Sequence, residues 1–112
     1  MRQSGILAAA VLYALDNHMD RLADDHANAK LIASIVDGAG GATVVSPDTN
    51  IVMVDLPAGR STAPVVAAMK AKGVRVAEWS DTRIRMVTHL DVNEADCRLA
   101  AETLKAELER IA

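Results

Sequence analysis

Hydrophobic residues dominate the first seventeen positions of the chain. Gln3 to about Asn17 contains the run ILAAAVLYAL, which has almost no polar face. A helix that is apolar on every side is normally buried on every side, and a domain of this size cannot easily surround a helix at its own end. The run therefore predicts a helix that packs against another subunit or a further domain. The alternative is a core helix wrapped by the chain's own small sheet.

The rest of the chain alternates between helical and strand-like patterns. Apolar residues recur at helical spacing over 18–37, and GAGG at 38–41 stops the pattern, with Gly38 expected just past the helix end. Strands are expected at 42–46, 50–56, 74–79 and 82–88, and further helices at 62–72 and 93–111. The expected inward positions are Leu22, Ala29, Ile32, Ala33 and Val36 in the second helix, with Asp24, Asp25 and Lys30 outside, and Leu99, Leu104, Leu108 and Ile111 in the last helix. The order ααββαββα predicts an α+β domain in which a mostly antiparallel sheet of about four strands has helices covering one face.

Composition limits the possible partners. The 112 residues suffice for one domain, with 1–17 as an interface helix and 18–112 as an α+β body, and only 2% of them are aromatic, so the core must be aliphatic. A net charge of −3 without a basic cluster argues against a nucleic-acid partner. The longest apolar run, Gly5–Leu15, is too short to span a bilayer. Cys97 is the only cysteine, which excludes an internal disulfide and fits a reducing compartment. We therefore expect a cytoplasmic protein.

Residue spacing gives little support for catalysis or metal binding. The three histidines are scattered and share no ligand spacing, and no Ser, Cys or Lys has a local base partner. The Asp-Asp-His sequence at 24–26 points in different directions on a helix, which favours a solvated face. Cys97 is interpreted as a small buried hydrophobe, and His89 as a turn histidine. We expect no catalytic residue and no metal ligand within this chain.

Two arginines stand out in the last predicted strand. Arg83 and Arg85 are two positions apart, so both guanidinium groups lie on one face of the strand, while Ile84 and Met86 point the other way. A guanidinium group presents a planar fork of donors that matches carboxylate or phosphate. The strand is thus a candidate anion site. From spacing alone, the favoured interpretation is two solvated charges on the open face of a half-covered sheet.

Four segments of the chain resemble the C-terminal part of the low-specificity L-threonine aldolase family. They are MRQSGILAAAVLYAL at 1–15, LADDHANAKLIA at 22–33, DTNIVMV at 48–54 and RIRMVTHLDV at 83–92. This is a family of fold-type-I pyridoxal-phosphate (PLP) enzymes related to the aromatic β-eliminating lyases. The resemblance implies the small domain of a lyase that cleaves L-threonine or allo-threonine to glycine and acetaldehyde, with PLP on a lysine as electron sink.

The resemblance also implies roles for individual residues. Arg85 would bind the α-carboxylate of the amino-acid substrate, and Arg2 would reach the cofactor phosphate region of a neighbouring subunit. The Gly5–Leu15 helix would lie between domains and subunits of a homo-oligomer. Arg83 receives no role. In the family the Schiff-base lysine lies upstream of the Met-Arg-Gln segment, and no lysine of this chain matches it. The chain alone is therefore expected to be inactive without a PLP-binding large domain.

Two other functions remain open from the sequence. One is a free-standing, non-catalytic module that binds a small carboxylate with the face of Arg83 and Arg85. The other is a dimerisation unit that uses the Gly5–Leu15 helix as its interface.

Overall fold

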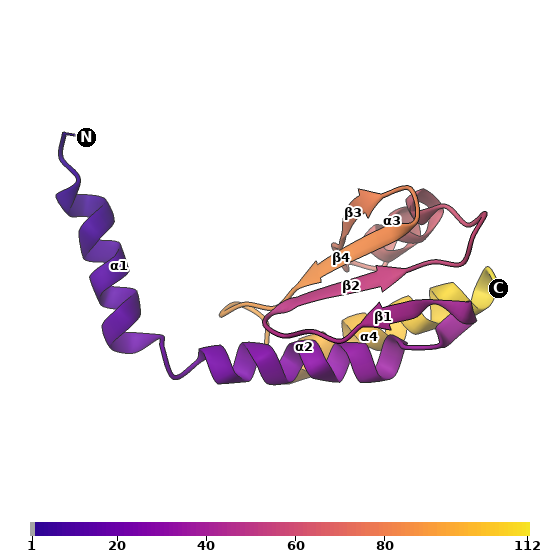
Figure 1. Ribbon diagram of the computed structural model, residues 1–112, viewed down its shortest axis with the longest axis horizontal. Helices are drawn as coiled ribbons and strands as arrows, with labels where there is room; N and C mark the ends of the chain where they lie inside the picture. The colour runs from indigo at the N-terminus through magenta and orange to yellow at the C-terminus, as the bar shows by residue number, and fades with distance from the viewer. Residues whose placement is uncertain (1) are drawn as a thin grey trace.

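The computed structural model describes residues 2–112 and has the expected α+β architecture (Figure 1). The elements are α1 (Gly5–Asn17), α2 (Leu22–Val36), a short 3₁₀ helix η1 (Ala39–Gly41), β1 (Thr43–Val45), β2 (Ile51–Asp55), α3 (Thr62–Ala71), β3 (Ala77–Ser80), β4 (Arg83–Val87) and α4 (Glu94–Arg110). Apart from η1, this is the predicted order ααββαββα.

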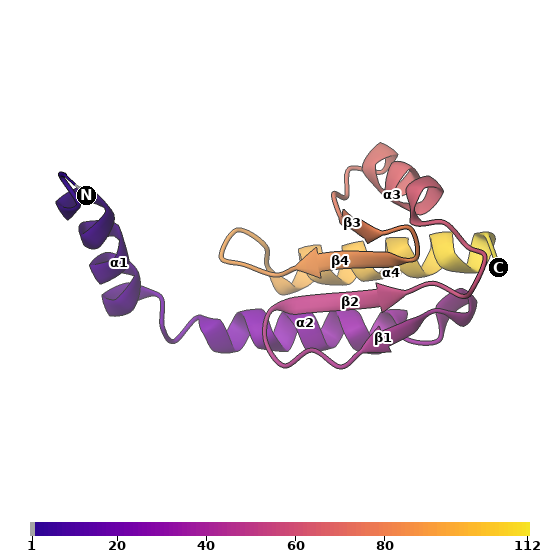
Figure 2. The ribbon, with the colours of Figure 1, turned by 45° about the horizontal axis from the view of Figure 1, so that its top comes forward.

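The four strands form one sheet in the order β1-β2-β4-β3, and every neighbouring pair is antiparallel. Strands β2 and β3 therefore run parallel with β4 between them, and α3 connects them. Helices α2, α3 and α4 lie on one side of the sheet and leave the other face uncovered (Figure 2). The prediction of a mostly antiparallel sheet with helices on one face is confirmed.

The core lies between the sheet and the helices and is aliphatic, as predicted. Strands β2 and β4 alternate buried with half-buried residues, as period-two strands with one covered face do. The fully buried hydrophobic side chains are Ala29, Val36, Val52, Val54, Val65, Met69, Ile84, Ala101 and Leu104.

Three positions in the helices differ from the prediction. Leu99, expected inside, is 61% exposed, because the inward stripe of α4 runs through Cys97, Ala101 and Leu104 and a residue two positions from Cys97 points to the opposite side. Leu22 is also exposed, since α2 begins beyond the end of the strands (Figure 1). Asp25, expected outside, is only 8% exposed. It lies against the segment that follows β4, where Thr88 Oγ1 donates a hydrogen bond to its carbonyl oxygen (2.7 Å).

Backbone conformation and local hydrogen bonds determine where several helices and strands begin or end. Gly38 adopts a φ of +81° just past α2, as expected for the residue that ends a helix. Asn93 caps α4 in a reciprocal capping box with Asp96. The expected strand at 74–79 is shorter, because the Val74 N–H donates to the Met69 carbonyl (3.0 Å) and the chain there follows the end of α3. Strand β3 consequently begins only at Ala77.

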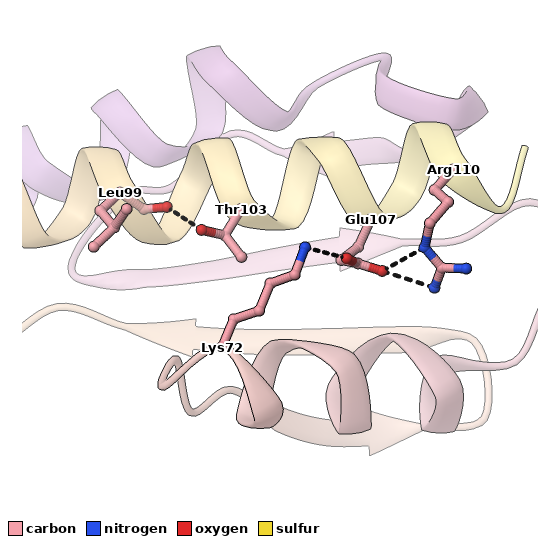
Figure 3. Close-up of polar contacts among 5 residues, drawn as sticks. All are labelled: Lys72, Leu99, Thr103, Glu107 and Arg110. Atoms are coloured by element: carbon pink, nitrogen blue, oxygen red, sulfur yellow. Dashed lines mark hydrogen bonds and ion pairs between the residues drawn. The ribbon is translucent and has the colours of Figure 1, made fainter.

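A buried carboxylate joins α3 to α4 (Figure 3). Glu107 of α4, with a side chain 4% exposed, accepts a hydrogen bond from Lys72 Nζ (2.5 Å) at the end of α3. Its other oxygen accepts a hydrogen bond from Arg110 Nε (2.9 Å) and forms an ion pair with Arg110 Nη2 (2.8 Å). These bonds, that from Lys72 most of all, hold the pKa of Glu107 below its ordinary value.

Helix α1 is separate from this body. None of its residues is buried, and it projects from the N-terminal end of α2 without touching the sheet (Figures 1 and 2). The radius of gyration is 16.2 Å, against about 13 Å for a compact domain of this length. The alternative of a helix wrapped by the chain's own sheet is therefore wrong. That another subunit or a further domain covers α1 stays a prediction. No helix among residues 2–112 has the length and apolar character needed to cross a membrane.

Two of the leucines in α4 provide a test of which face of this helix is buried. Leu104→Ala removes a fully buried side chain and should lower the free energy of unfolding by about 2–5 kcal/mol. Leu99→Ala, a matched control on the same helix, should change it by less than about 0.5 kcal/mol. Urea unfolding followed by circular dichroism measures both, and equal losses would contradict the assignment.

The ion pairs of Glu107 predict that the free energy of unfolding depends on pH. Because its pKa is lower in the folded chain, Glu107 contributes its full stabilisation above about 4.5, its ordinary pKa, and loses it as the pH falls through the folded-state value. The difference in unfolding free energy between the wild type and Glu107→Gln should therefore shrink below this pH. Glu102→Gln, an exposed control on α4, should show no such trend. A difference for Glu107→Gln that stays constant from pH 7 to 3 would rule out the ion cluster.

Candidate carboxylate site

Strand β4 presents both candidate arginines on the uncovered face of the sheet. The antiparallel register places Arg83 opposite Asp55 and Arg85 opposite Met53 of β2. On the other side of β4, Arg85 lies opposite Ala77 of β3. Both arginines are half-buried, and the residues between and after them, Ile84 and Met86, are buried toward the helices. The face predicted from their spacing is confirmed.

Arg83 is neutralised across the sheet by an acidic residue of β2. Its Nε donates to Asp55 Oδ1 (2.5 Å) and its Nη2 to Asp55 Oδ2 (2.7 Å). The hydrogen bonds from Arg83 lower the pKa of Asp55, and the carboxylate in turn raises the pKa of Arg83. This bidentate pair uses one edge of the guanidinium group. Arg83 is thus a cross-strand clamp whose charge is already compensated.

Arg85 is in a different electrostatic state. Within residues 2–112 its side chain makes no ion pair and no hydrogen bond; instead, its Cζ lies 5.4 Å from the centroid of the Trp79 ring. A ring over the face of a guanidinium group attracts the cation but leaves the in-plane N–H donors unused. Of the two arginines, Arg85 is therefore the one that has donors available for an anionic ligand.

Sequence analysis missed Trp79 as part of this site. It belongs to β3, where the register with β4 shifts between Glu78 and Ser80, and this irregularity accompanies its position beside Arg85. Strand periodicity puts Trp79 on the same face as Ala77, but it does not show that Ala77 pairs with Arg85. The only signal in the sequence is the presence of a single tryptophan in a chain that is otherwise almost free of aromatic residues.

A groove of about 580 Å³ adjoins Arg85 where the pairing of β3 with β4 ends. Residues 73–77 form one wall, the end of β4 and the following loop form the floor, and the first half of α4 forms the other wall. Its lining is mainly aliphatic, with Cys97 among it. Cys97 is buried, as predicted, and burial raises the pKa of its thiol.

Two other residues considered from the sequence differ in their position relative to Arg85. Arg2 is exposed, in the turn that precedes α1, at the opposite end of the molecule from the sheet (Figure 1). His89 is in the turn after β4, where its Nδ1 accepts a hydrogen bond from the Asp91 N–H (3.3 Å), in agreement with its interpretation as a turn histidine. His89 lines the groove to which Arg85 also contributes, whereas Arg2 does not.

The lysines among residues 2–112 lie away from the groove beside Arg85. Lys72 is held by Glu107, and the remaining lysines are exposed on α2, α3 and α4. None of them lines the groove beside Arg85. Among residues 2–112 there is also no group of three or more histidine, cysteine or acidic residues arranged to hold a metal ion.

Comparison with solved structures defines the class of fold. The chain superimposes on an archaeal alanine:glyoxylate aminotransferase with a TM-score of 0.67 over 88% of this chain and 27% of that chain. The sequence identity is 16%, so this likeness shows a shared fold and nothing more. The α+β body is therefore the kind of unit found in such aminotransferases.

Sequence comparison then gives the family. Residues 1–58 match the β-eliminating lyases. The low-specificity L-threonine aldolase of Escherichia coli K12 is 41% identical over 111 residues, which are 98% of this chain and 32% of that protein. Low-specificity L-threonine aldolase 1 of Arabidopsis thaliana is 33% identical over 100 residues, or 86% of this chain and 28% of that protein. The chain belongs to the β-eliminating lyase family, and it spans about a third of the length of these relatives.

Proposed function

We propose that this chain forms the C-terminal small domain of a PLP-dependent threonine aldolase, in which Arg85 binds the α-carboxylate of the substrate. The observation that carries the proposal is the difference between the two arginines of β4. Arg83 is neutralised by Asp55, whereas Arg85 has no carboxylate partner among residues 2–112. The relatives named as threonine aldolases support the reaction class.

The chemistry of Arg85 fits this role. Two parallel N–H donors on one edge of a guanidinium group match the two oxygens of a carboxylate, so they fix its orientation as well as its charge. A carboxylate bound at this edge is held on the open face of the sheet, away from the helices. The remainder of an amino acid then extends outward, toward whatever covers that face.

In this proposal most of the residues that bind the cofactor belong to a large domain outside this chain. PLP supplies an electron sink for the carbanion at the substrate Cα, and its lysine would come from a large domain, since the lysines here do not fit. We propose that Arg2 contacts the cofactor phosphate of a neighbouring subunit. Its exposure at the far end of α1 supports a contact outside its own body. On this proposal the chain alone does not cleave threonine.

Helix α1 is proposed to be the interface with a further subunit. Its large apolar side chains are all exposed in the chain alone; they are Ile6, Leu7, Val11, Leu12, Tyr13 and Leu15. Such a continuous apolar surface is typical of a protein–protein contact. A homo-oligomer in which copies of α1 are covered would remove this surface from water.

Substitution of each arginine tests the substrate role. In a complete aldolase that contains this chain, Arg85→Ala should raise KM for L-threonine about 30-fold or more, because a lost bidentate charged pair costs about 2 kcal/mol or more. Cofactor absorbance should be unchanged. Steady-state kinetics and a PLP titration measure the two quantities.

Arg83→Ala is the matched control for this experiment. It removes an equal charge from the same face, but one that Asp55 already neutralises, so its main effect should be on stability rather than on KM. Unchanged threonine kinetics in Arg85→Ala would refute the proposed role, and a free-standing carboxylate-binding module or a dimerisation unit would then be the better description.

The apolar surface of α1 predicts self-association of the isolated chain. Replacement of Leu7 and Leu12 by glutamine removes apolar surface from an exposed helix and leaves the core intact. Sedimentation velocity should show concentration-dependent association of the wild type that the double variant loses. Replacement of the exposed Leu99 on α4 serves as the control and should leave association unchanged. A wild-type chain that stays monomeric at high concentration would argue against α1 as an interface between copies.

A further inference from the structure

We infer that Trp79 is a positioning residue for Arg85, which holds the guanidinium group in place before a carboxylate binds. The inference rests on the proposed function of Arg85 and adds a second residue to that site. It starts from the cation–π contact of 5.4 Å between Arg85 Cζ and the ring centroid of Trp79. It follows from how the fold brings these two side chains together.

The irregular end of β3 brings the tryptophan to Arg85. Ala77 and Glu78 pair in register with Arg85 and Ile84, but the next residue paired is Ser80, opposite Arg83. Trp79 is therefore an extra residue in β3, without a partner of its own in β4. Such bulges bend a strand locally and change the direction of a side chain. Trp79 is two positions from Ala77, the partner of Arg85, so alternation along β3 puts its side chain on the same face of the sheet as Arg85. The ring centroid lies 5.4 Å from Arg85 Cζ, at the point where the bulge interrupts the pairing.

The backbone on the far side of the bulge is fixed by the start of α3. Thr62, which is fully buried, donates from Oγ1 to the Ser80 carbonyl (2.9 Å) and from its N–H to the Asp81 carbonyl (2.8 Å). These two bonds attach the end of β3 to a helix of the core. Although Trp79 is 57% exposed, it is thus carried by an anchored piece of backbone.

The contact with Trp79 limits the conformational freedom of the Arg85 side chain and leaves its N–H donors unoccupied. An arginine that moves freely loses rotamer entropy when it binds a ligand, and a guanidinium group held by a cation–π contact has lost part of that entropy beforehand. Tryptophan is the best ring for this purpose. The neighbouring Arg83 needs no ring, because Asp55 fixes it through two hydrogen bonds. The two arginines are therefore held by different means, and only the means used for Arg85 leaves its edge available.

Kinetics of a complete aldolase that contains this chain test the inference. Trp79→Leu should raise KM for L-threonine about two- to five-fold, with kcat unchanged. Trp79→Phe keeps a ring over Arg85 and should restore most of the loss. In an Arg85→Ala background, Trp79→Leu should have no further effect, because the tryptophan acts only through the arginine. A separate, additive loss in that background would overturn the positioning role.

The outcomes distinguish this inference from the proposed function. If Arg85→Ala raises KM strongly and Trp79→Leu leaves it unchanged, Arg85 binds the substrate but Trp79 does not position it, and the inference fails alone. If neither variant alters KM, the proposed function fails and the inference with it. A coupled loss with rescue by phenylalanine supports both.

A measurement without any enzyme activity checks the contact itself. Trp79 is the only tryptophan in the 112-residue chain, so its fluorescence reports on one site. Arg85→Leu should shift or intensify the emission, whereas Arg83→Leu, which removes a charge held by Asp55, should leave it close to that of the wild type. Equal spectra for the wild type and Arg85→Leu would show that the ring does not contact Arg85 in solution, and would overturn the inference.

Discussion

The register between β2 and β4 is the constraint on which the rest of the structure depends. One alignment of these two central strands buries Val52, Val54 and Ile84 against the helices and, on the other face, places Arg83 opposite Asp55. A slip of a single residue would expose the aliphatic side chains and turn the arginines into the core. Packing of the core and charge compensation on the open face are therefore satisfied by the same alignment, and each reinforces the other.

The pairing of β2 with β4 also explains which features of the sheet the residue spacing could predict and which it could not. Period-two alternation was sufficient to predict β4 and the shared face of Arg83 and Arg85. It could not tell which arginine is neutralised, because Asp55 lies 28 positions earlier in the chain and meets Arg83 only through strand pairing. Trp79 was missed for a related reason, since only the pairing of β3 with β4 shows that it lies beside Arg85.

The errors in the helices have a different physical origin. In α4 the sequence offers two stripes, one with Leu99 and one with the smaller Cys97 and Ala101, and hydrophobicity alone favours leucine. Ala101 of α4 and Ala29 of α2 are both fully buried where these helices pack against each other, because small side chains allow close approach. Asp25 is buried because the segment after β4 covers it and bonds to its backbone. Such choices depend on a neighbouring element and cannot be read from one helix.

The edges of the sheet have a consequence for how copies of this chain can meet. Strand β1 has three residues and β3 has four, and the pairing of β3 is interrupted by its extra residue. Few consecutive backbone groups are thus left for a strand of another molecule to continue the ladder. Open-ended growth into fibres by strand addition is disfavoured at both ends of the sheet. Association between copies would then depend on side-chain surfaces, such as the exposed apolar residues of α1, and not on backbone pairing.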